Sequence, residues 1–193
     1  MRFTKIPSDT FQKLQLNAAI LLRDFKPADG SFKPTDQIGA TTGGINFTAT
    51  PTFSDFGEDI DNCPKNMKEL KKLEEWDVKS TGTFVTMDTA AAKSLCAAAD
   101  IGAEDTTKVT PRNDLSDSDY GDIWIVGDYS DKNGATGGGY IAIRMMNALS
   151  TGGFQMQTSD KAKGQFAFEY TAHYSMNAQD TVPFEIYIKT GTA

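Results

Sequence analysis

Histidine and cysteine are scarce in this sequence, which excludes several kinds of chemical site. The 193 residues include a single histidine, His173, and two distant cysteines, Cys63 and Cys96. These residues cannot supply the ligands of a zinc site or the pairs of a disulfide framework. No Gly-X-Ser-X-Gly nucleophile motif is present beside the histidine. The sequence therefore predicts no enzyme, no metal site and no cofactor.

Long apolar runs and an excess of basic residues are also missing. No segment reaches the length of a transmembrane helix, and the opening residues MRFTKIPSDT lack the apolar stretch of a secretory signal. The net charge is −7, with 19 Lys and Arg residues against 26 Asp and Glu residues. Proteins that grip nucleic acid by its phosphates present a basic surface instead. We expect a soluble chain that is made in a cytoplasm and has no membrane segment.

The acidic residues gather between residues 100 and 131. Only Lys108 and Arg112 oppose them in this stretch. The acidic members are Asp100, Glu104, Asp105, Asp114, Asp117, Asp119, Asp122, Asp128 and Asp131. Two interpretations stay open: a solvated loop surface, or a field that repels an anionic partner.

A glycine-rich stretch, DYSDKNGATGGG at residues 128–139, separates two apolar runs. If Gly134 is placed at the glycine position of a helix-loop-helix calcium loop, Tyr129 and Tyr140 occupy the positions of the first and last ligands. The flanks are β-branched and aromatic, and no Gly-Lys-Ser/Thr follows the glycines. The pattern predicts a β-hairpin, with a weak cation site as the alternative.

Alternation of apolar and polar residues predicts a mainly β fold. Ile45, Phe47, Ala49 and Phe53 share one face of the clearest strand, and Pro51 places that strand at an edge or at the end of regular pairing. The predicted strands cover residues 14–22, 45–53, 77–87, 122–129, 140–147, 152–158, 164–176 and 182–189.

One helix interrupts the strands. It is predicted over about residues 89–101, with Asp88 or Thr89 as the N-cap and Gly102 as the stop. The whole chain, residues 1–193, then forms one domain. We expect a β-sandwich or partial barrel of about seven to eight strands with this helix on its flank.

Residues 54–76, SDFGEDIDNCPKNMKELKKLEEW, form a long polar excursion that we predict to be an extended loop. A solvated loop has no need of Phe53, Phe56, Ile60 and Trp76. These side chains either dock on another surface or pack on their own chain. The spacing of Met67, Leu70 and Leu73 also allows a thin helical stripe.

Three extended segments resemble the major tail tube proteins of long-tailed bacteriophages and of prophages of Gram-positive bacteria. They are FTKIPSDTFQKLQLNAAILLRDF at residues 3–25, IGATTGGINFTATPTFSDFGEDIDNCPKNMKELKKL at 38–73, and LSTGGFQMQTSDKAKGQFAFEYTAHYSMNAQDTVPFEIYI at 149–188. They occur in the same order and span nearly the whole chain. The stretch around residues 100–120 resembles the family least.

The resemblance implies a β-sandwich protomer with a flanking helix that assembles into stacked hexameric rings, in the host cytoplasm at first and then in the virion tail. DNA would pass through an acidic to neutral bore without specific binding, with some acidic side chains facing the bore. A tape-measure protein, a tail chaperone and tail terminator or distal tail proteins are the partners that the family implies.

In this family a long loop after an early strand reaches the neighbouring ring, and the excursion is the segment of this chain that corresponds. The candidate contacts between subunits or rings are Phe53, Asp55, Phe56, Glu58, Asp59, Ile60, Asp61 and Trp76.

Two other classes of function compete with a tube subunit. A β-sandwich binding or adhesion module would expose aromatic residues in a groove and would fold as a monomer or trimer. A capsid decoration protein would bind a shell lattice instead of stacking on itself.

Overall fold

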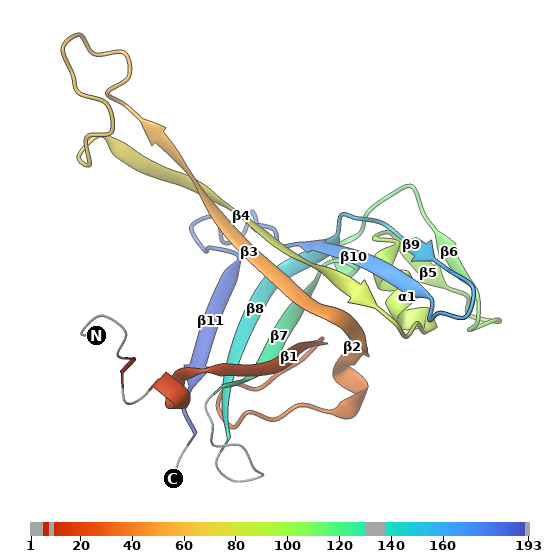
Figure 1. The fold of residues 1–193 in the computed structure, drawn as a ribbon. Helices are drawn as coiled ribbons and strands as arrows, with labels where there is room; N and C mark the ends of the chain where they lie inside the picture. Colours follow the sequence, from red (N-terminus) through yellow and green to blue (C-terminus); the bar gives the residue numbers. More distant parts are fainter. Residues whose placement is uncertain (1–5, 8–9, 130–137, 192–193) are drawn as a thin grey trace.

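The computed structural model describes residues 6–7, 10–129 and 138–191 of the chain. Nine of its strands form one branched, antiparallel sheet whose two halves share strand β8 (Figure 1). We call the halves the first layer and the second layer. Within the described residues the sheet does not close into a barrel, and the predicted mainly β class with one α-helix is confirmed.

The first layer has the strand order β2-β1-β7-β8, with β11 on the other side of β8. Its strands are β1 (Gln15–Leu22), β2 (Gln37–Gly39), β7 (Gly121–Tyr129), β8 (Gly139–Ser150) and β11 (Phe184–Lys189).

The second layer has the order β3-β4-β10, with β9 beside β10. Its strands are β3 (Thr41–Asp55), β4 (Lys71–Phe84), β9 (Gln155–Gln157) and β10 (Gln165–Thr171). The end of β8 joins the two layers, because Ser150 pairs with Tyr170 and Leu149 with Thr171.

The main core lies between the layers, as the alternation predicts. Leu21, Ile125 and Met145 of the first layer belong to the same buried cluster as Phe168 and Tyr170 of the second. Burial of side chains of this size stabilises the fold by about 1.5–3 kcal/mol each. A smaller cluster of Leu22, Phe25, Trp124 and Ala142 lies on the other face of the first layer.

The single α-helix, α1 (Thr89–Leu95), is shorter than predicted. Asp88 caps its start, because the carboxylate accepts a hydrogen bond of 2.6 Å from the Ala91 N–H. The prediction of a helix continuing to residue 101 was wrong. Ala97 takes a left-handed φ of 60°, and residues 99–101 form strand β5 (Ala99–Ile101), which pairs with β6 (Val109–Pro111).

Two hydrogen bonds hold α1 on the sheet. The Ser150 hydroxyl donates to the Leu95 carbonyl at 3.0 Å, and the hydroxyls of Ser94 and Tyr170 lie 3.0 Å apart. Three short 3-10 helices complete the described elements: η1 (Thr10–Lys13), η2 (Pro34–Asp36) and η3 (Asp117–Asp119).

Each predicted strand has a counterpart, although several bounds differ. The segment 164–176 stops pairing at Thr171, so His173 lies beyond strand β10 and not in the middle of a strand. Strands β3 and β4 are longer than predicted, because they run far into the polar excursion. No helix among the described residues is both long enough and apolar enough to cross a membrane.

Candidate assembly surfaces

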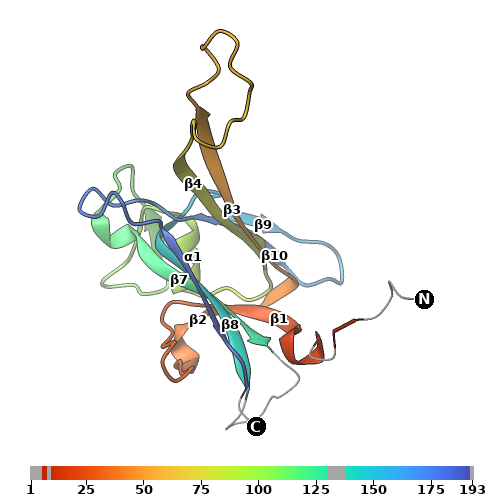
Figure 2. The same ribbon diagram turned by 90° about the vertical axis from the view of Figure 1, so that its left-hand side faces the viewer.

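Residues 56–70 of the polar excursion form a loop, as predicted, whereas both ends of the predicted range, residues 54–55 and 71–76, belong to strands β3 and β4. Strand β3 continues to Asp55, which pairs with Lys71 at the start of β4. Strand β10 pairs with β4 only from Lys79 onward, so the outer parts of β3 and β4 pair with each other alone. They project away from the two layers (Figures 1 and 2). We call residues 51–76 the arm and residues 56–70 its tip.

Asp55 organises the base of the tip. Its two carboxylate oxygens accept hydrogen bonds from the N–H groups of Gly57 and Asn66, each at 2.9 Å. These bonds, the one from Gly57 first, lower the pKa of the Asp55 carboxyl below its ordinary value. Asn62 and Asn66 adopt left-handed φ values of 60° and 61°, which asparagine tolerates better than most residues.

The tip and the outer arm expose apolar side chains. The exposed fractions are 50% for Phe53, 60% for Phe56 and 53% for Ile60. The acidic residues of the tip are exposed as well, and they are Glu58, Asp59 and Asp61. Seven of the eight candidate contact residues therefore gather at the outer end of the arm: Phe53, Asp55, Phe56, Glu58, Asp59, Ile60 and Asp61.

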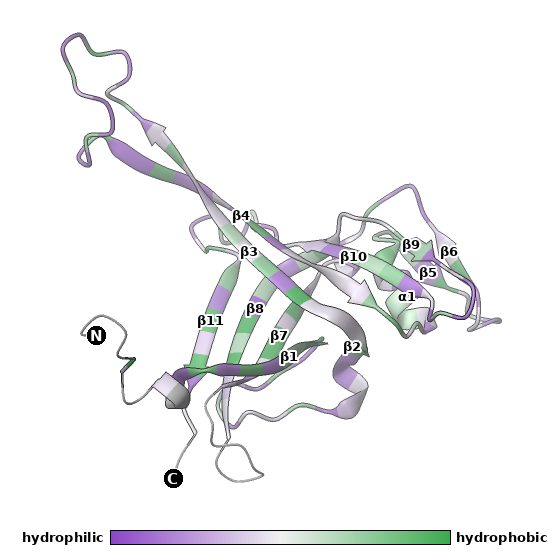
Figure 3. Cartoon of the chain, in the orientation of Figure 1, coloured by the Kyte–Doolittle hydropathy of each residue, from purple (hydrophilic) through white to green (hydrophobic). Residues whose placement is uncertain are grey.

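Trp76 is the exception among the candidates. Its ring packs edge-on against Phe184 at 5.4 Å and contacts the main core, so it fixes the arm to its own chain. Trp76 therefore packs on its own chain, whereas Phe53, Phe56 and Ile60 stay exposed and docking on another surface remains a prediction for them. The suggested helical stripe was wrong, because residues 68–70 lie in turns and β4 begins at Lys71. Figure 3 shows that hydrophilic residues dominate this outer part of β4.

The outer face of the second layer is polar and nearly uncharged. Antiparallel pairing places Asn46, Thr81 and Glu169 side by side, and it does the same for Thr48, Lys79 and Thr171. Further residues of this face are Thr42, Thr50, Thr83, Ala167 and Gln155, together with Asp77.

Lys79 and Asp77 offset each other on this face, and Glu169 is a third charged residue there. The Lys79 ammonium lies 2.9 Å from the Asp77 carboxylate, and this hydrogen bond raises the pKa of Lys79. We call this surface the polar face.

Strand β3 is the open edge of the second layer, as Pro51 predicts. Pro51 pairs with Trp76, whose N–H donates to the Tyr174 hydroxyl at 3.0 Å and therefore points away from β3. Opposed residues in an antiparallel pair point their N–H groups either both inward or both outward. The Pro51 nitrogen thus faces the open edge, where it removes one donor.

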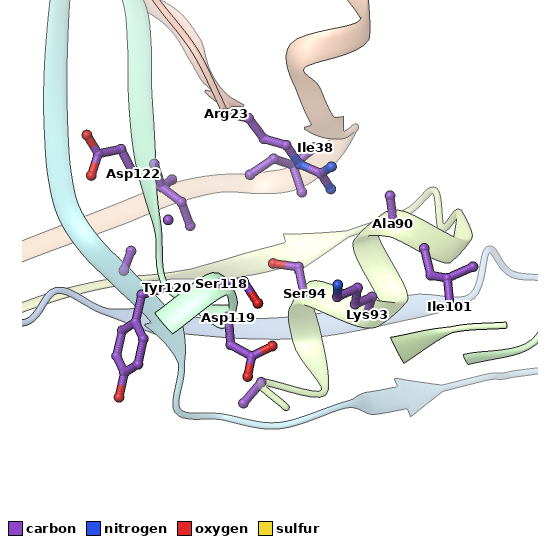
Figure 4. Close-up of a pocket in the computed structure, with 14 residues that line it drawn as sticks. Arg23, Ile38, Ala90, Lys93, Ser94, Ile101, Ser118, Asp119, Tyr120 and Asp122 are labelled. Carbon is purple, nitrogen blue, oxygen red and sulfur yellow. The ribbon is translucent and has the colours of Figure 1, made fainter. Parts of the chain in front are cut away.

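A cleft of about 410 Å³ lies between α1, η3 and the ends of β1 and β2 (Figure 4). Its apolar lining includes Ile38, Ala90, Ala97, Ile101 and Ile123, and its charged lining consists of Arg23, Lys93, Asp119 and Asp122.

The two carboxylates of the cleft each form an ion pair with an arginine that is not part of the cleft lining. Asp119 forms an ion pair with Arg112, and Asp122 forms one with Arg144, both at 2.6 Å. In the part of the chain that the structure describes, Arg23 and Lys93 form no ion pair. Arg112 and Arg144 each pair with a second carboxylate as well, whereas the two basic side chains of the cleft lining, Arg23 and Lys93, are without an ion pair among the described residues.

The acidic stretch 100–131 is partly neutralised by its own chain. Arg112 binds Asp100 at 2.8 Å as well as Asp119. Asp105 accepts hydrogen bonds from the N–H and the hydroxyl of Thr107, and these bonds lower the pKa of its carboxyl. Several of these carboxylates thus have local structural roles.

The other residues that the sequence suggested as candidate sites are His173 and the glycine-rich stretch 128–139. The His173 ring lies 3.1 Å from the Asn147 carbonyl and edge-on to Tyr120. The pairing of Tyr129 with Gly139 fits a hairpin at 128–139, but residues 130–137 and the candidate cation site lie outside the described residues. Over the described ranges, no group of three or more His, Cys, Asp or Glu side chains is placed to hold a metal ion.

Comparison with known proteins adds no family to this description. A scan against protein-family models finds no match, and a search of curated proteins finds no matching sequence.

Sequence reasoning missed the cleft, because its lining comes from residues 23 to 148 and no single segment carries a signal.

Proposed function

We propose that this chain is a structural virion protein that assembles into stacked hexameric rings, and that the stack is a phage tail tube through which DNA passes. The arm carries this proposal. Its tip stands clear of the two layers, and Phe56 and Ile60 in it are more than half exposed. An exposed apolar patch on a projecting element is typical of a contact with another subunit.

The polar face supports the role of a bore wall. The second layer offers four strands, and six copies side by side would give a barrel about 45 to 50 Å across at about 4.8 Å per strand and a tilt of about 40°. Such a barrel leaves room for duplex DNA. Its lining of Thr, Asn and Gln with few charges would hold phosphates weakly, because tight binding needs basic side chains.

The open edge of β3 supports joining of neighbouring subunits. An unpaired strand edge is a template for another strand, and closure into a ring removes that edge. The joined rings would belong to the virion tail. A tape-measure protein, a tail chaperone and terminator or distal tail proteins are the further partners that we propose.

The other function classes have less support. Carbohydrate-binding and nucleic-acid-binding faces use aromatic platforms or basic residues. The strand positions that form the polar face carry neither aromatic residues nor any basic residue besides Lys79. An enzyme would need a nucleophile or a paired acid and base in a cleft, and we propose no such role.

Negative-stain electron microscopy of the purified chain tests the proposal. We expect rings or hollow tubes at high protein concentration. The double variant Phe56→Ser with Ile60→Ser should keep the circular dichroism spectrum of the wild type but lose stacking, because the tip no longer offers apolar surface.

The variant Phe32→Ser is a matched control, since Phe32 is also exposed, at 45%, and lies outside the arm. It should assemble like the wild type. Globular monomers of the wild-type chain at high concentration would instead favour a binding module. Normal tubes from the double variant would show that the arm does not form the stacking contact.

A further inference from the structure

The arm tip exposes apolar side chains, and three of its acidic side chains have no ion pair among the described residues. Phe56 and Ile60 are more than half exposed. Glu58, Asp59 and Asp61 are exposed beside them and form no ion pair with the described residues. A surface of this kind fits a partner that is apolar at its centre and positively charged at its margin.

The cleft beside α1 has the complementary character. Its apolar lining, which we call the floor, includes Ile38, Ile101 and Ile123, and its volume of about 410 Å³ accommodates one or two apolar side chains. Arg23 and Lys93 are its basic side chains without an ion pair among the described residues, whereas Asp119 and Asp122 are each paired with an arginine. The cleft and the tip therefore match in both polarity and charge.

The tip cannot reach the cleft of its own chain. The arm points away from the layers, whereas α1 lies at the opposite end of β4 (Figures 1 and 2). A contact between the two surfaces must therefore join different copies. It would be heterologous, because the surface on one copy differs from the surface on the next, and heterologous contacts extend an assembly in one direction.

We infer that the arm tip of one copy docks in the cleft of another copy. Phe56 or Ile60 enters the apolar floor, and Glu58, Asp59 and Asp61 face Arg23 and Lys93. This inference rests on the proposed function, because it assigns the receiving surface for the contact between stacked subunits.

Reciprocal charge reversal tests the inference. The cleft variant Arg23→Glu with Lys93→Glu and the tip variant Asp59→Lys with Asp61→Lys each place like charges in contact. We expect each variant alone to need about tenfold or more protein for assembly, as followed by analytical ultracentrifugation and electron microscopy. Lys161→Glu with Lys163→Glu makes the same charge change outside the cleft lining and should leave assembly unchanged.

An equimolar mixture of the cleft variant and the tip variant is the decisive sample. Each altered surface then meets an oppositely charged one on the other variant, so assembly should return, and this return also shows that both variants are folded. Wild-type assembly that persists in the cleft variant, or a mixture that fails to assemble, overturns the inference alone. A wild-type chain that remains monomeric overturns both the inference and the proposed function.

Discussion

Ser80 and Ser150 are two buried serines with opposite surroundings. Ser80 is fully buried opposite Tyr170, and its hydroxyl has no hydrogen-bond partner among the described residues. Ser150 is almost as buried, but its hydroxyl donates to the Leu95 carbonyl at the end of α1. An unpaired buried hydroxyl carries a desolvation cost, whereas a paired one contributes to stability.

The substitution Ser80→Ala should therefore raise the free energy of unfolding by up to about 1 kcal/mol. Ser150→Ala should lower it by about 1 kcal/mol, because the Leu95 carbonyl loses its donor. Urea unfolding, followed by circular dichroism at a protein concentration too low for assembly, measures both changes. A loss of stability in Ser80→Ala would mean that its hydroxyl is hydrogen-bonded in solution.

At the scale of an element, the tip depends on one carboxylate. The folded pKa of Asp55 lies below its ordinary value of 3.8, because the N–H groups of Gly57 and Asn66 donate to the ionised form. This contribution to the order of the tip is fully present above the ordinary value. It is lost as the pH falls through the lower, folded pKa.

We expect the amide resonances of Gly57 and Asn66 to shift together below about pH 4 in an NMR titration of the monomer. Asp55→Asn retains only one acceptor oxygen, so one of the two amides should lose its hydrogen bond at every pH. Two amide resonances that stay fixed throughout the acid titration would contradict the arrangement of the tip.

The elements that were predicted well from the sequence are those with one face packed on the core, because such a face produces a regular pattern of apolar residues. Ile45, Phe47 and Ala49 alternate with polar residues because one face of β3 packs on the main core, so the strand can be predicted from them directly. The outer end of β4 could not be predicted in the same way. Residues 71–75, KKLEE, project into solvent on both faces, so no buried side leaves a pattern in the sequence.

The helix end and the cleft depend on tertiary structure. Nothing local distinguishes Ala97 from the alanines before it, yet it ends α1 because residues 99–101 pair with residues 109–111. The candidate contacts gathered at the arm because they are neighbours in sequence. Arg23 and Lys93 are far apart in sequence and meet only in the fold, so no local pattern could join them.

At the scale of the whole molecule, the polar face is the surface that would meet DNA. Thr48 and Thr81 lie on neighbouring strands of this face. In a hexameric ring each position would occur once per subunit, so a single substitution there changes a complete circle of side chains. Charge added at these positions should change the electrostatic potential of the bore more than the stability of the fold, because neither side chain belongs to the core.

Replacing Thr48 and Thr81 with Lys should convert a passive bore into one that holds DNA. Short duplexes should sediment with the variant tubes at low salt and be released at high salt, because the added charges displace counterions from the phosphates. The matched variant with Gln at both positions should bind no more DNA than the wild type. Equal DNA retention by the Lys and Gln tubes would indicate that another face lines the bore.

Pro51 has a consequence for the chain before it meets any other copy. An unpaired strand edge can add further strands without limit, as happens in amyloid fibrils. The missing donor at Pro51 interrupts such a ladder at the point where the arm begins, and only residues 41–50 of β3 lie on the body side of that gap. The proline therefore separates two parts of the β3 edge. Residues 41–50 can pair with a strand of a neighbouring subunit, whereas pairing cannot continue without interruption into the arm.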